Sequence, residues 1–133
     1  MGNIGVFAVI VNDNKILLGK RNYGNYYWTL PGGKIEDKER IIDALKREVQ
    51  EETNQEIIVD KYVLTSYDIN KYSIALVYKC RIEKKKELKF PESELSELKW
   101  FDINCLPKDD LTERQRKWIC CAINEDFAGV VEI

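Results

Sequence analysis

A single amphipathic helix with acidic residues on the border of its apolar face constrains this chain more than any other feature. The helix is predicted within the stretch LPGGKIEDKERIIDALKREVQEETNQ, residues 30–55. On a wheel of about 100° per residue, its apolar residues fall within roughly 100° of one another and face a core; they are Ile41, Ile42, Leu45 and Val49. Glu48 and Glu52, one turn apart, lie at the edge of this face, with Glu51 beside them.

Carboxylates that are half withdrawn from water repel each other and are costly to desolvate. A cation compensates such a cluster, and oxygen ligands three and four residues apart on a helix suit a hard divalent ion. The alternative is a solvated helix, because the pattern ExxEE is ordinary in charged helices. The residues that flank the cluster favour the metal site.

The spacing of these flanking residues resembles the signature box of the Nudix hydrolases, GX5EX7REUXEEXGU, where U is aliphatic. The chain matches the box at Gly33, Glu39, Arg47, Glu48, Val49, Glu51 and Glu52. It departs at the end, where Asn54 replaces glycine and Gln55 replaces the aliphatic residue. Asn54 is a mild departure, because Asn follows Gly in its tolerance of the left-handed conformation that ends a helix.

The resemblance implies a metal-dependent hydrolase that cleaves the pyrophosphate bond of a nucleoside diphosphate linked to another group, as in a (d)NTP or a nucleotide sugar such as ADP-ribose. It implies Mg²⁺ or Mn²⁺ bound by one carbonyl and three carboxylates, those of Gly33, Glu48, Glu51 and Glu52. Arg47 would orient the carboxylates through a bidentate contact. A catalytically silent nucleotide-binding module is the alternative, but such proteins usually lose box glutamates, and this chain keeps all of them.

The general base is expected to be Glu48 or Glu94, because the family places its base differently from member to member. Glu94 belongs to the acidic segment PESELSELKWF, residues 91–101, which also resembles Nudix chains. Some members use a glutamate of this loop as an extra metal ligand or base. Glu94 is the best placed by its distance from the following strand, with Glu92 and Glu97 as rivals, and a solvent-facing acid is the alternative for all three.

Three residues before the box are candidates for substrate binding. Arg21 follows a strand expected at 15–19, where Nudix proteins often carry a basic residue that reaches substrate phosphates. Tyr23 lies in the aromatic loop NYGNYY, and Trp28 follows this loop. Aromatic side chains beside a phosphate site could stack on a nucleobase. Core packing is the alternative for Trp28.

The start of the box helix carries two further acidic residues. Asp37 is expected as the N-cap, and Glu39 is expected in the first turn, where negative charge suits the helix dipole. Because Glu39 lies on roughly the opposite side of the wheel from Glu48, its expected role is structural, through capping or a pair with Arg47.

The order of the predicted elements favours an α/β fold, in which a mixed sheet lies between the box helix and a C-terminal helix. The Nudix resemblance implies the same α/β/α sandwich. A central strand is expected at 4–11, because this segment is apolar on both faces. A hairpin strand is expected at 15–19, a strand pair at 56–68 and 72–82, a helix at 111–126, and a short strand or loose tail at 127–133. We expect a single Nudix domain over residues 1–133.

Composition narrows the partners and the chemistry. A net charge of −2 argues against a general nucleic-acid binder. The absence of histidine and of a CxxC pair argues against zinc, and leaves a carboxylate as the favoured base. The apolar run at 4–11 is too short for a membrane span and lacks the basic prefix of a signal peptide. We therefore expect a cytoplasmic protein that acts on a small nucleotide, and the sequence leaves a homodimer through its apolar C-terminal tail open.

Overall fold

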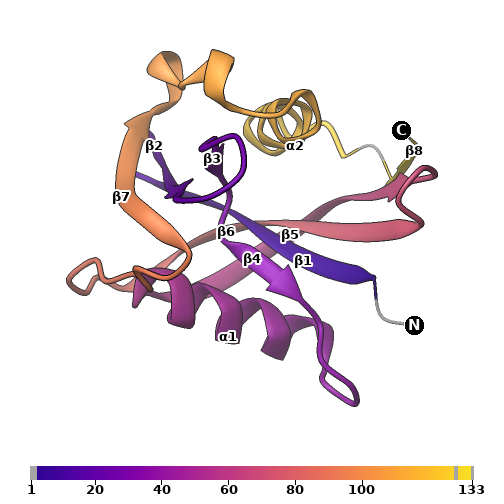
Figure 1. Cartoon of the computed structure of the whole chain (residues 1–133), viewed down its shortest axis with the longest axis horizontal. Helices are drawn as coiled ribbons and strands as arrows, with labels where there is room; N and C mark the ends of the chain where they lie inside the picture. Colours follow the sequence, from indigo (N-terminus) through magenta and orange to yellow (C-terminus); the bar gives the residue numbers. More distant parts are fainter. Residues whose placement is uncertain (1–2, 128, 133) are drawn as a thin grey trace.

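The computed structural model describes residues 3–127 and 129–132 and contains one mixed sheet with a helix on each side (Figure 1). The strand β1 (Ile4–Asn12) lies inside this sheet. It pairs in parallel with β6 (Ser73–Lys84) and antiparallel with the short β4 (Gly32–Lys34). Its C-terminal end forms a hairpin with β2 (Lys15–Arg21). The central strand and the hairpin predicted from the sequence are confirmed.

The sheet extends on both sides of β1. Beyond β2 lie β3 (Trp28–Thr29) and β7 (Leu95–Asp102), both antiparallel to it. Beyond β6 lies β5 (Glu56–Asp68), antiparallel, and then β8 (Gly129–Glu132), which runs parallel to β5. The predicted strand pair is therefore confirmed, and residues 129–132 form a strand.

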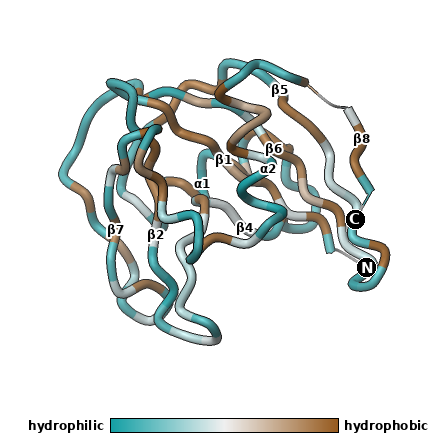
Figure 2. The backbone as a smooth tube through the Cα atoms, turned by 90° about the horizontal axis from the view of Figure 1, so that it is seen from above, coloured by the Kyte–Doolittle hydropathy of each residue, from teal (hydrophilic) through white to brown (hydrophobic). Residues whose placement is uncertain are grey.

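Alternate side chains of β1 enter two separate cores, because successive residues of a strand point to opposite faces of the sheet. Val6, Ala8 and Ile10 pack in the core under α1 (Ile41–Thr53). Val9 packs in the core under α2 (Glu113–Ile123), together with Phe7 and Val11. Figure 2 shows hydrophobic segments along the inner strands and hydrophilic ones along the outer loops. The predicted mixed sheet between two helices is confirmed.

The buried face of α1 is wider than the sequence predicted. Its buried residues are Ala44, Leu45, Val49 and Thr53, whereas Ile41 is 42% exposed. On the wheel used above, this face spans from about 300° at Ala44 to about 120° at Thr53. Glu48 and Glu52, at about 340° and 20°, therefore lie inside the buried arc and not at its border. The expectation that Ile41 faces the core is wrong.

The expected start of the helix is also wrong. The N-cap is Arg40, which makes no side-chain capping hydrogen bond, and Asp37 lies outside the helix. Lys38 has a φ of 63°, a left-handed conformation that interrupts a right-handed helix. The Glu39 carboxylate accepts a hydrogen bond from the Glu36 backbone N–H at 3.0 Å, which closes a turn before the helix begins.

The two departures from the Nudix box tie the end of α1 to the segment at 85–89. Asn54 adopts the predicted left-handed conformation, with φ 62° and ψ 20°, and its Nδ2 donates to the Glu87 carbonyl at 2.9 Å. Gln55 is 1% exposed. Its Oε1 accepts from the Lys86 N–H at 3.1 Å and its Nε2 donates to the Lys86 carbonyl at 2.9 Å. Gln55 therefore forms hydrogen bonds to the Lys86 backbone at a position where the Nudix box has an aliphatic residue.

The C-terminal helix α2 lies within the predicted segment 111–126 but is shorter at both ends, and it begins after Thr112, whose hydroxyl accepts from the Gln115 N–H at 3.2 Å. Two short 3₁₀ turns, Ile103–Cys105 and Lys108–Asp110, connect β7 to it. Among the helices of residues 3–127 and 129–132, none has the length and apolar character needed to cross a bilayer.

Candidate active site

A cavity of about 500 Å³ lies where α1, β4 and the loop before β7 meet. Glu48 and Glu52 of α1 line it, together with Glu94 of the loop. Arg21 and Lys34 also line it, so acidic and basic side chains share this cavity, which we call the carboxylate cavity. The combination can hold an anionic substrate beside carboxylates that bind a cation or accept a proton.

Gly33 allows β4 to approach Glu48 closely. A Cβ at Gly33 would lie 2.5 Å from the carboxyl carbon of Glu48, which is closer than any non-bonded contact permits. The box glycine and the first glutamate of the EVQEE run are therefore packed against each other. The neighbouring Gly32 has a different reason to be glycine, because a Cβ there would overlap the Val6 carbonyl and Phe7.

Glu52 is buried beside other carboxylates. Burial raises its pKa to about 9, and the hydrogen bond and charge of Glu48 add to this shift, followed by the charge of Glu94. A hydrogen bond with the Gly32 backbone acts in the opposite direction. Glu48 and Glu52 thus form a pair of oxygen ligands whose combined negative charge is unfavourable until a proton or a cation shares it.

Arg47 holds the outer side of this cluster. Its guanidinium makes a bidentate contact with Glu39, with Nε–Oε2 at 2.7 Å and Nη2–Oε1 at 2.9 Å, which confirms the predicted pair. It also donates to Glu48 Oε1 at 3.0 Å and to the Lys34 carbonyl at 3.2 Å. The Arg47 hydrogen bond, more than any other contact, lowers the pKa of Glu39 to about 2, and the pKa of Arg47 is raised. Arg47 therefore links α1, β4 and the turn before the helix.

Glu51 differs from the other two box glutamates. Its carboxylate lies 3.3 Å from Arg47 Nη1, and its side chain is 57% exposed. Within residues 3–127 and 129–132, no three Cys, Asp or Glu side chains form a complete metal-ligand set. The donor atoms nevertheless suit Mg²⁺ or Mn²⁺, because they are all oxygens and because the carboxyl groups of Glu48 and Glu52 lie side by side in the cavity. The residues present fit such an ion.

The three predicted substrate contacts separate into two groups. Arg21 and Tyr23 line the carboxylate cavity, and the Arg21 guanidinium lies 6.0 Å from the Tyr23 ring centroid. Trp28 is 8% exposed and packs edge-on against Phe101 in the core under α2, with centroids 4.7 Å apart. The prediction that Trp28 contacts substrate is corrected, because its ring is used for core packing.

The structure also distinguishes Glu94 from its rivals. Glu94 lines the carboxylate cavity and contributes to the raised pKa of Glu52. Glu97 lies in β7 opposite Lys20, and neither it nor Glu92 is among the residues that line this cavity. The backbone N–H of Asn22 donates to the Glu94 carbonyl at 3.2 Å, which fixes the loop beside the end of β2.

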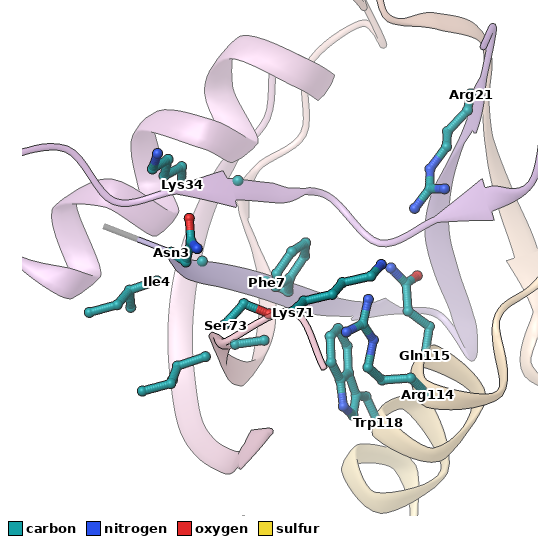
Figure 3. A pocket seen from close by; sticks show the side chains of 14 residues that line it. Asn3, Ile4, Phe7, Arg21, Lys34, Lys71, Ser73, Arg114, Gln115 and Trp118 are labelled. Carbon is teal, nitrogen blue, oxygen red and sulfur yellow. The ribbon is translucent and has the colours of Figure 1, made fainter. Parts of the chain in front are cut away.

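A second cavity of about 410 Å³ adjoins the first, and the two share Phe7, Arg21, Gly33 and Lys34. It lies between β1, the β5–β6 turn and the start of α2 (Figure 3). The sequence did not indicate its further basic residues, Lys71 and Arg114, because they lie far from the box in the chain. The position of Lys34, directly after Gly33 of the box, could have indicated that this lysine lies near the site.

Gln115 connects α2 to the segment that enters the box. It is 4% exposed; its Oε1 accepts from the Leu30 N–H at 2.9 Å, and its Nε2 lies 2.9 Å from Thr29 Oγ1. The sequence analysis missed this residue, because a glutamine in an exposed-looking helix turn gives no sign of a partner 85 residues earlier.

Comparison with known proteins gives the class of this site. The NUDIX domain family profile matches residues 1–120. An RNA pyrophosphohydrolase of Pelagibacter ubique is 30% identical over 120 residues, which cover 74% of this chain and 75% of the relative. Nucleoside triphosphatase NudI of Escherichia fergusonii is 32% identical over 129 residues, which cover 84% of this chain and 90% of the relative.

A solved structure supports the fold. The NUDIX hydrolase from Nitrosomonas europaea superimposes with a TM-score of 0.81 at 21% identity, over 98% of this chain and 78% of the other. The fold, the cavity and the box together define a hydrolase of phosphate anhydrides. The chain belongs to the Nudix hydrolase family, whose members generally use divalent metals and act on small nucleotides.

Proposed function

We propose that this Nudix hydrolase cleaves the pyrophosphate bond of a nucleoside diphosphate linked to another group, a (d)NTP or a nucleotide sugar such as ADP-ribose. The observation that carries the proposal is the carboxylate cavity, in which Glu48, Glu52 and Glu94 face the same space as Arg21 and Lys34. Carboxylates alone would repel a diphosphate, so this arrangement requires a bound cation.

Four residues would hold Mg²⁺ or Mn²⁺ through oxygen atoms, namely Gly33, Glu48, Glu51 and Glu52. When bound, the metal neutralises phosphate oxygens and lowers the pKa of a coordinated water. Glu48 and Glu52 line the cavity, whereas Glu51 is paired with Arg47 outside it and would have to rotate away from Arg47 to join them. Arg47 fixes Glu48 through its 3.0 Å contact and acts as a positioning residue.

Arg21 and Lys34 contact the phosphate oxygens, since both lie where the two cavities meet. Tyr23 lines the carboxylate cavity, and its ring, 56% exposed, can stack on a substrate group. The second cavity takes the nucleoside, because the partly exposed Phe7 ring gives it an aromatic surface and Asn3 and Ser73 give it polar groups.

Glu94 is the residue that accepts a proton from the attacking water at its carboxylate. Glu48, the other candidate, already accepts a hydrogen bond from Arg47 at 3.0 Å, which occupies one of its carboxylate oxygens. Glu94 lies on a loop that the Asn22 N–H holds beside the cavity. These positions support Glu94 as base and Glu48 as metal ligand.

The test is product release from a panel of dNTPs, ADP-ribose, UDP-sugars, GDP-sugars and a dinucleoside polyphosphate, with Mg²⁺, with Mn²⁺ and with EDTA. We expect metal-dependent cleavage of one class. Glu94→Gln should lower turnover, whereas the matched variant Glu83→Gln, at an exposed glutamate near the end of β6, should not. Absence of cleavage by folded protein would instead support a silent nucleotide-binding module.

A further inference from the structure

The second cavity carries more positive charge than its neighbour. Four basic side chains line it, from β2, β4, the β5–β6 turn and α2, and the carboxylates Glu48, Glu52 and Glu94 do not. Arg21 and Lys34 are shared with the carboxylate cavity and are assigned above to the pyrophosphate. Lys71 and Arg114 line the second cavity and not the carboxylate cavity, so the pyrophosphate does not account for them.

Lys71 and Arg114 lie at the same end of this cavity. Figure 3 shows the Lys71 side chain directed across it toward Gln115 and Arg114. One acid faces the pair: the Asp68 carboxylate lies 3.3 Å from Arg114 Nη1 and accepts the Lys71 backbone N–H at 3.2 Å. Asp68 fixes the turn and compensates one of the two charges, which leaves a net positive charge at this end.

The surrounding groups show what kind of ligand fits. Arg114 lies over the Trp118 ring, 5.4 Å from its centroid, and Trp118 packs on Phe7 with centroids 5.3 Å apart. Trp118 is 2% exposed, so the partly exposed Phe7 ring is the aromatic surface beside the cationic end. A planar heterocycle with an attached anion matches this combination, because the heterocycle can pack on Phe7 while a phosphate contacts Lys71 and Arg114.

We propose that Lys71 and Arg114 bind a second phosphate of the substrate, separate from the pyrophosphate that is cleaved. The inference rests on the proposed function and deepens it, since it names the substrate class as nucleotides that carry a phosphate beyond the scissile linkage. Two sources supply this chemistry: an ester phosphate on the ribose, or the additional phosphates of a longer chain between two nucleosides.

Matched substrate pairs test the proposal and separate the two sources. NAD⁺ against NADP⁺ adds a 2′-phosphate, dephospho-CoA against CoA adds a 3′-phosphate, and diadenosine diphosphate against diadenosine tetraphosphate lengthens the chain. We expect kcat/KM to favour the phosphate-rich member of at least one pair by about tenfold or more, as one charge-assisted contact to phosphate allows. Which pair shows the preference identifies the source.

Lys71→Gln and Arg114→Gln should each bring this ratio close to one. Lys71 is exposed in a turn, so its substitution is compatible with folding, whereas Arg114→Gln also removes the Asp68 contact. The matched controls are Lys85→Gln, in the segment after β6, and Lys117→Gln, on the exposed side of α2. A ratio near one for every pair in the wild type, or a preference that survives both cavity substitutions, would overturn the proposal.

A binding measurement without chemistry distinguishes failure of this inference from failure of the proposed function. Titration calorimetry in EDTA compares AMP with adenosine 3′,5′-bisphosphate and adenosine 2′,5′-bisphosphate. Tighter binding of a bisphosphate that is lost in Lys71→Gln supports the phosphate site even if no pyrophosphate is cleaved, and the proposed function alone then fails. Cleavage of pyrophosphates without any preference in either assay overturns the phosphate site and leaves the function intact.

Discussion

Replacing Glu52 by glutamine gives the sharpest test of the carboxylate cavity, because it separates the effect of the Glu52 charge on folding stability from the role of this carboxylate in metal binding and turnover. In the metal-free protein the pKa of Glu52 is about 9, compared with 4.5 for an unperturbed glutamate. Between these two pH values the folded protein binds a proton that the unfolded chain does not. The free energy of unfolding of the metal-free wild type should therefore fall as pH rises through this window.

The magnitude follows from the linkage relation. One proton bound only by the folded state gives a slope of up to about 1.4 kcal/mol per pH unit. Over the three pH units from pH 5 to pH 8 this slope gives at most about 4 kcal/mol, and we expect about 2 to 4 kcal/mol of lost stability. For a chain of this length that corresponds to a Tm lower by roughly 5 to 15 °C. Glu52→Gln cannot ionise, so it should lack this loss.

The assay is thermal unfolding of both proteins from pH 5 to pH 9 in EDTA and in Mg²⁺. In EDTA the variant should become the more stable protein as pH rises, whereas Mg²⁺ should raise the Tm of the wild type far more than that of the variant. Glu52→Gln should also lower turnover by orders of magnitude. Equal pH slopes for the two proteins in EDTA, or retention of more than about a tenth of wild-type turnover (about 1.4 kcal/mol of barrier), would refute the role assigned to Glu52.

Four further substitutions test single contacts. Gly33→Ala should lower turnover by about tenfold or more with little change in Tm, because the new Cβ displaces only the flexible end of the Glu48 side chain. Gly32→Ala should instead lower Tm, because its new Cβ would overlap backbone atoms. Equal effects of the two substitutions on Tm would contradict this reasoning. Gln55→Leu restores the aliphatic residue of the box. It should lower the free energy of unfolding, measured by chemical denaturation, by about 1 to 3 kcal/mol, because it leaves the Lys86 backbone groups unpaired. A more stable variant would show that these hydrogen bonds are dispensable. Glu39→Gln should lower the free energy of unfolding at pH 7. Its difference from wild type should shrink as pH falls from 4.5 toward about 2, because Glu39, whose pKa is lowered in the folded protein, becomes protonated over this range and the stability from its charge is lost. A difference in the free energy of unfolding that stays constant with pH would contradict the Arg47 contact.

The sequence was informative wherever a pattern is local. The box helix, the strands around it and the left-handed Asn54 follow from residue periodicity and from the conformational preference of one residue. The Glu39–Arg47 pair was also within reach, because both residues belong to one fixed motif. The start of the helix was not, since the turn at 36–40 depends on Lys38 in an uncommon conformation and on a carboxylate that bonds to backbone instead of the helix end.

The predictions of single substrate-binding residues depended on where each side chain points in the folded protein, which the sequence does not show. Tyr23 and Trp28 belong to one aromatic stretch, yet Tyr23 lines the cavity while Trp28 packs against Phe101 of β7. Glu92, Glu94 and Glu97 are similar in sequence, and only the path of the loop beside Asn22 brings Glu94 to the cavity. Such choices are made by packing between distant segments.

Helical and strand periods and the fixed box motif were enough to predict the fold class and the family, because they act over a few residues at a time. The surroundings of the box depended on the tertiary structure. It placed Glu48 and Glu52 inside the buried arc of α1, made Gln55 an anchor for the segment at 85–89, and brought Lys71 and Arg114 together beside Trp118. The physical reason is that burial and charge depend on neighbours that the sheet brings close together from distant parts of the chain.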